Sequence, residues 1–147
     1  MIDFDTNARI VPLAAVSAAI FRDGRVLLVK RSRPPSAEMW SLPGGHIEPG
    51  ETALDAVNRE LREETTIAAR IVEIAGVKDV IHRNDSGKLI FHRVVIVFCG
   101  EWLSGEPKAG DDAAAAGWHD LNELPVLATT EGLAEIARSA RMKLFGP

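Results

Sequence analysis

The stretch at residues 44–67 constrains this chain more than any other part of its sequence. It reads GGHIEPGETALDAVNRELREETTI, and residues 52–64 within it predict a helix. A threonine that can cap this helix is followed three residues later by an aspartate, which resembles a capping box. At 100° per residue, the side chains of Glu60, Glu63 and Glu64 fall within an arc of about 100° on the helix surface.

The clustered glutamates have two interpretations. Three carboxylates on one helix face are what a hard divalent cation such as Mg²⁺ needs, because Mg²⁺ takes oxygen ligands. An ordinary solvated acidic face is the alternative, since glutamate favours helices and is usually exposed.

The neighbouring residues favour a metal site. Leu54, Val57 and Leu61 occupy the adjacent arc and are expected to pack on a sheet, so the carboxylates flank a buried stripe. Gly44 and Gly45 end an expected strand just before the helix, which permits close backbone approach and leaves a carbonyl free toward a metal.

A charged pair is also expected beside this helix. Glu51 and Arg59 are eight residues apart, and an ion pair between them could brace the loop against the helix. Arg59 could instead be an ordinary solvated arginine.

The spacing of these residues resembles the Nudix box, Gly-x5-Glu-x7-Arg-Glu-U-x-Glu-Glu-x-Gly-U, in which U is apolar. The departure is Thr66, where the family has a glycine that looks like a left-handed helix cap. Threonine there should cost about 1 kcal/mol or change the cap geometry. Eight of the nine specified positions match, at Gly45, Glu51, Arg59, Glu60, Leu61, Glu63, Glu64 and Ile67.

The rest of the chain alternates extended and helical patterns. An Asp-Gly turn and an Asn-Asp-Ser-Gly turn each separate two apolar runs, which predicts two antiparallel hairpins. We expect strands at 13–21 and 25–30, at 70–81 and 88–99, and around 117–121, a polar loop at 104–112, and a closing helix at 130–143.

This order resembles the Nudix fold across nearly the whole chain. The resemblance implies an α+β protein built as an α/β/α sandwich, with a mixed β-sheet between helices, and we expect one domain over residues 1–147. In such enzymes a late acidic residue often completes the metal site. Asp112 is the candidate for this role, with Asp111 beside it.

The resemblance implies Mg²⁺-dependent hydrolysis, with Mn²⁺ as a possible substitute, of a nucleoside diphosphate linked to another moiety. It gives the metal ligands as Glu63, Glu64 and the Gly45 carbonyl, with Glu60 as either a further ligand or the general base. Phosphate contacts are expected from Arg31, Arg33 and Gly44, since arginine donates bidentately to phosphate. The predicted catalytic residues are Glu51, Arg59, Glu60 and Glu63.

The substrate is expected to be a small nucleotide. The leading hypothesis is a nucleotide-sugar such as ADP-ribose. One alternative is a nucleoside triphosphate pyrophosphohydrolase that acts on oxidised or noncognate nucleotides of the 8-oxo-dGTP type. A second is a nucleotide-sensing Nudix module without catalysis, although all three box glutamates remain. A plain structural domain would leave the charged spacing unexplained.

Composition limits the other partners. A net charge of −4 argues against an extended nucleic-acid surface, and apolar stretches are too short for a transmembrane helix. Acidic residues at positions 3 and 5, and Cys99 as the only cysteine, fit a protein of the cytoplasm. A homodimer is possible, with the apolar segment 10–13 as one candidate contact.

Overall fold

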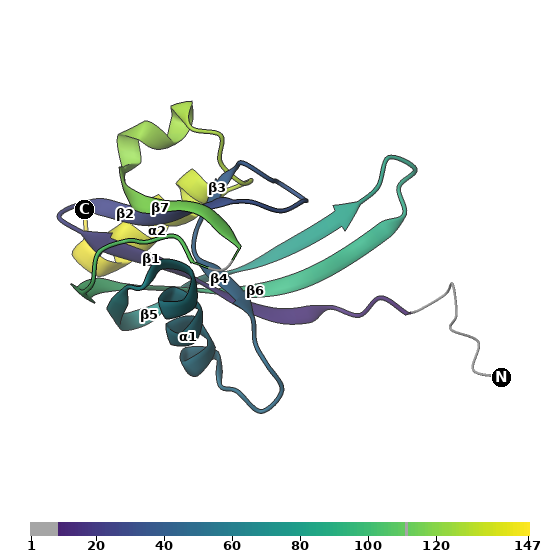
Figure 1. The fold of residues 1–147 in the computed structure, drawn as a ribbon, viewed down its shortest axis with the longest axis horizontal. Coiled ribbons are helices and arrows are strands. Elements are labelled where there is room, and N and C mark those ends of the chain that lie inside the picture. The colour runs from purple at the N-terminus through teal and green to yellow at the C-terminus, as the bar shows by residue number, and fades with distance from the viewer. Residues whose placement is uncertain (1–8, 111) are drawn as a thin grey trace.

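The computed structural model describes residues 9–110 and 112–147. The expectations for residues 1–5 and for Asp111 lie outside this described part. In the described residues, one mixed sheet separates two helices (Figure 1).

The sheet has seven strands in the order β3-β2-β1-β6-β5, with β4 also paired to β1 and β7 also paired to β2. The β1–β6 pair is parallel, and the other pairs are antiparallel. The strands are β1 (Leu13–Arg22), β2 (Arg25–Arg31), β3 (Trp40–Ser41), β4 (Gly44–His46), β5 (Ala68–Arg83), β6 (Leu89–Ser104) and β7 (Ala113–Asp120).

Each face of the sheet carries one helix. Helix α1 (Ala53–Thr65) buries Val57 and Leu61 against one face, and α2 (Leu133–Phe145) buries Ala137 and Ala140 against the other. A short 3₁₀ helix, η1 (Leu121–Val126), precedes α2. The expected α+β sandwich with a mixed sheet between helices is therefore confirmed.

Both predicted hairpins form, and the second is longer than predicted. Asp23 and Gly24 have φ values of 50° and 78°, the positive values that a tight two-residue turn needs. Strands β5 and β6 each extend over sixteen residues. β7 begins four residues earlier than expected and ends at Asp120, while α2 begins at Leu133 because Gly132 adopts a left-handed conformation.

One predicted core residue is wrong. Leu54 remains 49% exposed, whereas Val57 and Leu61 are buried as expected. The first turn of α1 packs on the core through Ala53 and Ala56 instead, because these small side chains let the helix approach the sheet. One half of the expected capping box is present, since the Thr52 hydroxyl accepts a hydrogen bond from the Asp55 N–H at the start of the helix.

Thr66 keeps the left-handed cap geometry that the family glycine would adopt. Its φ and ψ are 62° and 12°, and its backbone N–H donates to the Arg62 carbonyl. The Thr66 hydroxyl donates to the Glu106 carbonyl at 2.9 Å. A β-branched residue is strained at positive φ. Threonine therefore adds backbone strain at this cap relative to glycine, but the geometry of the cap is unchanged.

Replacing Thr66 with glycine should raise the free energy of unfolding by about 0.5–1 kcal/mol, because glycine adopts positive φ without steric cost. The lost hydroxyl bond is exposed and subtracts little. Urea unfolding measures the change. Thr66→Ala, which loses the hydroxyl but keeps Cβ, should show no such gain. A lower unfolding midpoint for Thr66→Gly than for the wild type would contradict the strain argument.

The β5–β6 hairpin and the start of β1 project together from the body of the molecule (Figure 1). Ile10 and Val11 just before β1, and Leu13 at its first position, are 40–52% exposed. The possible homodimer stays a prediction. In the described residues, no helix is long and apolar enough to cross a membrane.

Candidate active site

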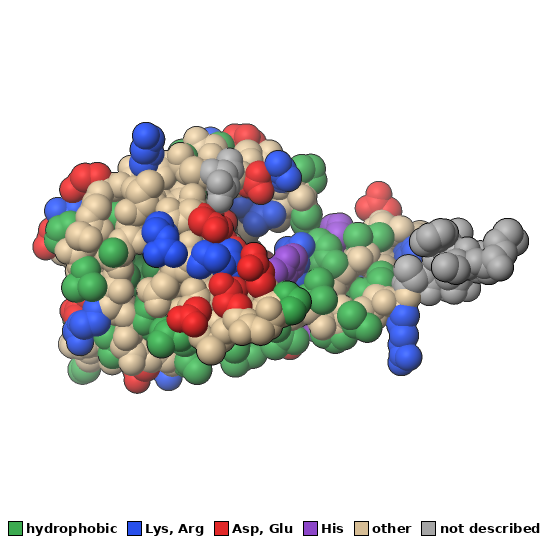
Figure 2. All heavy atoms as spheres, turned by 60° about the horizontal axis from the view of Figure 1, so that its bottom comes forward, with side chains coloured by type: hydrophobic (Ala, Val, Ile, Leu, Met, Phe, Trp, Pro, Cys, Tyr) green, Lys and Arg blue, Asp and Glu red, His purple; other side chains and the backbone are tan. Residues whose placement is uncertain are grey.

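Arg59 lies at the centre of the acidic cluster on α1. Its Nε and Nη2 donate to both carboxylate oxygens of Glu51 at 2.7 and 2.9 Å. Its Nη1 donates to Glu60 at 2.8 Å and to Glu63 at 3.2 Å. Figure 2 shows acidic and basic side chains gathered on this side of the molecule, beside a hollow. One guanidinium thus offsets the repulsion among three carboxylates, and it is not an ordinary solvated arginine.

The same guanidinium links the segments that make up the Nudix-like motif. Arg59 also donates to the His46 carbonyl at 3.1 Å, so it links β4, the following loop and α1. Hydrogen bonding from Arg59 lowers the pKa of Glu51 to about 2, and bonding to Glu51 raises the pKa of Arg59. Both groups therefore stay charged at neutral pH.

The Glu51–Arg59 pair predicts a pH dependence of stability. The pKa of Glu51 falls from its ordinary 4.5 to about 2 in the folded protein, so the unfolded chain binds more protons between these values. The stabilisation is fully present above pH 4.5 and is lost as the pH falls toward 2. Urea unfolding across this range should show a steeper loss for the wild type than for Glu51→Gln. Equal slopes would contradict the prediction.

Close backbone packing places Gly44 and Gly45 against α1. The Gly44 N–H donates to a Glu64 carboxylate oxygen at 3.3 Å. A Cβ built on Gly45 would lie 2.5 Å from the Glu60 carboxyl carbon. The Glu60 carboxylate therefore contacts the Gly45 backbone. This contact is the close approach of strand backbone to helix that the glycine pair predicted.

The loop between β6 and β7 covers the carboxyl end of α1. Lys108 and Gly110 donate their N–H groups to the carbonyls of Thr65 and Glu64, which satisfies helix carbonyls that lack partners within the helix. Asp112 follows in this loop, and its carboxylate pairs with Arg33 at 2.8 Å. The backbone just before Asp112 thus contacts the end of α1, but the Asp112 side chain pairs with Arg33, a predicted phosphate-binding residue.

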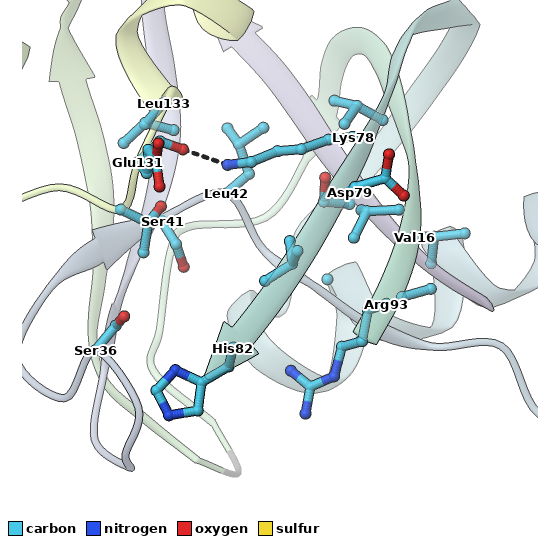
Figure 3. A pocket seen from close by; sticks show the side chains of 18 of the residues that line it. Val16, Ser36, Ser41, Leu42, Lys78, Asp79, His82, Arg93, Glu131 and Leu133 are labelled. Atoms are coloured by element: carbon cyan, nitrogen blue, oxygen red, sulfur yellow. Dashed lines mark hydrogen bonds between the residues drawn. The ribbon is translucent and has the colours of Figure 1, made fainter. Parts of the chain in front are cut away.

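A cleft of about 430 Å³ reaches Gly44 and Gly45, the two glycines that contact Glu64 and Glu60. Gly44, Gly45 and Arg31 line it, together with the inner face of the β5–β6 hairpin and residues that precede α2. Figure 3 shows side chains from these separate segments facing one space. Arg33 does not line the cleft, so the two predicted phosphate-binding arginines differ in their surroundings.

Sequence reasoning missed Arg93, which projects from β6 into this cleft (Figure 3). Burial, and then the nearby charge of Arg31, lower the pKa of Arg93. Partial burial, and then the charge of Arg93, lower the pKa of His46. The available signal was a lone cation inside an apolar strand, two residues from Phe91 and so on the same face.

The residues present fit a hard divalent cation. Glu60, Glu63 and Glu64 carry carboxylate oxygens, the ligand type that Mg²⁺ prefers, and the Gly45 backbone contacts the Glu60 carboxylate. Over residues 9–110 and 112–147, no three His, Cys, Asp or Glu side chains could hold a metal by themselves. That incomplete set is compatible with Mg²⁺, which usually retains water and takes phosphate oxygens from its substrate.

The sandwich and its braced glutamate helix together define the architecture of a Nudix hydrolase. A family model described as the NUDIX domain matches residues 11–140, and the chain belongs to this family. Enzymes of the family act on small nucleotide substrates and generally use divalent metal ions.

Curated relatives carry pyrophosphatase names. An ADP-ribose pyrophosphatase of Methanocaldococcus jannaschii is 42% identical over 80% of this chain and 67% of its own length. A putative 8-oxo-dGTP diphosphatase 2 of Mycobacterium tuberculosis is 37% identical over 84% of this chain and 87% of its own. The chain is accordingly a Nudix pyrophosphohydrolase.

A solved structure agrees with the fold. The MutT Nudix hydrolase from Burkholderia pseudomallei superposes with a TM-score of 0.75 at 36% identity. The match covers 88% of this chain and 98% of that protein. The fold expected from the sequence is therefore found in a related crystal structure.

Proposed function

We propose that this enzyme hydrolyses the pyrophosphate bond of a nucleotide-sugar such as ADP-ribose. The main support for this proposal is the cluster of Glu51, Glu60 and Glu63, each paired with Arg59. The cluster lies near a cleft that is lined by further arginines. The relative named ADP-ribose pyrophosphatase supports this substrate class.

In the proposed reaction, water attacks one phosphorus of ADP-ribose and the bond from that phosphorus to the bridging oxygen breaks. The products are AMP and ribose 5-phosphate. Glu60 accepts the proton of the attacking water or serves as a metal ligand, and Arg59 holds its carboxylate in place. A bound Mg²⁺ would supply charge neutralisation at the pyrophosphate and a lowered pKa for water.

The proposed cation would be held by Glu63, Glu64 and the Gly45 carbonyl, with Asp112 available from the late loop. The Glu63 side chain is 44% exposed, which leaves it accessible to a cation. Asp112 would first have to release Arg33. Mn²⁺ is the expected substitute because it also accepts carboxylate and water ligands.

A second candidate is hydrolysis of oxidised nucleoside triphosphates to monophosphates with release of pyrophosphate. The relative named as a putative 8-oxo-dGTP diphosphatase favours it. Both reactions would use the same carboxylates. Their substrates share a pyrophosphate linkage and differ in the groups attached to it. A nucleotide sensor without catalysis is a lesser candidate than either reaction, because every box glutamate is retained.

The test is a substrate panel with Mg²⁺ or Mn²⁺, with products separated by chromatography and Glu63→Gln as the control. The panel contains ADP-ribose, other nucleotide-sugars, dinucleoside polyphosphates, ordinary triphosphates and 8-oxo-dGTP. AMP plus ribose 5-phosphate, lost in Glu63→Gln, would support the leading proposal. Selective release of pyrophosphate from 8-oxo-dGTP would replace it with the second candidate. Binding without any cleavage would indicate a sensor.

A further inference from the structure

Arg93 is held in a fixed position in the cleft by a stack of side chains. Its guanidinium carbon lies 4.2 Å from the ring centroid of Phe91, two residues earlier on the same face of β6. His82 of β5 stacks on the same ring, with centroids 5.2 Å apart and an interplanar angle of 28°. A guanidinium placed on an aromatic ring is oriented before any ligand arrives.

Within the part of the chain that the structure describes, the charge of Arg93 has no anionic partner. Its Nε is buried without a hydrogen-bond partner, and no carboxylate in the described residues forms an ion pair with it. Burial without pairing costs free energy, which is expressed as the lowered pKa of Arg93. Such a group is expected where an incoming ligand supplies the missing anion.

A second cation faces the same space. Arg31 lines the cleft from β2, and its Nε donates to the Pro35 carbonyl rather than to a carboxylate. Two acidic residues line the cleft: Asp79, which pairs with His92 at 3.1 Å, and Glu131, which lies just before α2. The positive charges of Arg31 and Arg93 repel each other. A single ligand with more than one negative charge would stabilise both, close to the backbone of Gly44 and Gly45.

We propose that Arg93 is a specificity-determining residue that binds phosphoryl oxygens of a nucleoside diphosphate, with Phe91 as its positioning residue. This inference deepens the proposed function and rests on it for the identity of the reaction. Phosphate matches the unpaired donors because a guanidinium donates two parallel hydrogen bonds to its oxygens. Arg31, which lines the same cleft, binds the same diphosphate, and the two cations favour diphosphates over uncharged nucleosides.

The test measures binding without chemistry. ADP and adenosine are titrated calorimetrically in EDTA into the wild type, Arg93→Gln and Arg93→Lys. Arg93→Gln should raise the Kd of ADP by about tenfold to about a hundredfold, the range for a hydrogen bond to a charged group. The ADP Kd of Arg93→Lys should be intermediate, because lysine keeps the positive charge but lacks the two parallel donors of a guanidinium. The Kd of adenosine should be the same in all three proteins. Arg83→Gln is the matched control, since it removes an exposed arginine from the same hairpin.

Two readouts separate ligand binding from a structural role. Removing a partly buried guanidinium that lacks an anionic partner should not lower the Tm, so Arg93→Gln should melt at or above the wild-type temperature. Phe91→Leu, which leaves the guanidinium unsupported, should raise KM for the substrate found in the panel with kcat retained.

The proposal is overturned by an equal ADP Kd in wild type and Arg93→Gln, by a wild type that does not bind ADP, or by an equal loss of adenosine binding. Because ADP binding in EDTA needs no turnover, these outcomes are distinct from failure to cleave ADP-ribose. Cleavage with unchanged ADP binding in Arg93→Gln would refute only the role of Arg93.

Discussion

Replacing Glu60 with glutamine should lower kcat by about two to four orders of magnitude, the usual contribution of a positioned general base. The Glu60 side chain is only 14% exposed, accepts a hydrogen bond from Arg59 and rests on Gly45. Glutamine has the same shape, and its carbonyl can still accept that bond, so the geometry survives while the negative charge and the basic site are lost. KM should therefore change little.

The measurement is steady-state kinetics on the substrate found in the panel. Asp55→Asn is the matched control, because it neutralises an exposed carboxylate on the same helix. It should leave kcat within about twofold, as expected for a surface substitution. If Glu60→Gln retains turnover, the base lies elsewhere, and the loop that carries Asp112 becomes the next place to search.

The two adjacent glycines should respond differently to substitution. In Gly45→Ala the new methyl would meet the end of the Glu60 side chain at 2.5 Å, a group that can move. We expect the protein to fold with kcat reduced by about a hundredfold, since displacing a catalytic group by about 1 Å costs that much. In Gly44→Ala the methyl would lie 2.1 Å from the Val16 carbonyl oxygen, which is backbone within the β1–β4 pair.

Gly44→Ala should therefore lower the free energy of unfolding by about 3 kcal/mol, at the upper end of overpacking effects. Urea unfolding and activity measured on both variants separate the two effects. A fully active Gly45→Ala would refute the placement of Glu60 on the Gly45 backbone. A Gly44→Ala protein as stable as the wild type would refute the close packing of β4 on β1.

Local sequence patterns predicted which strands and helices exist better than they predicted the residues at which these begin and end. The turns at Asp23–Gly24 and at 84–87 gave both hairpins, because turn residues act over a few positions. The lengths of β5 and β6 depend on pairing with each other over their whole extent, which a short window does not contain. Leu54 was misassigned for the same reason, since periodicity gives the face of a helix but not which turns reach the sheet.

Much of the candidate site was accessible from sequence because it lies within one short segment. The helical repeat alone brings Glu60, Glu63 and Glu64 together, and the eight-residue separation let the Glu51–Arg59 pair be foreseen. Those relations follow from the geometry of a single helix and the loop before it.

Other features were decided only by the tertiary structure. Arg93, Gly44 and Gly45 line one cleft because β4 and β6 both pair with β1, and local sequence does not contain these pairings. The pairing of Arg33 with Asp112, and the capping of α1 by the late loop, likewise join distant segments. By itself the sequence determined the family and its carboxylate helix, since both depend on local spacing. Only packing between distant elements determined the cleft and the cations that line it.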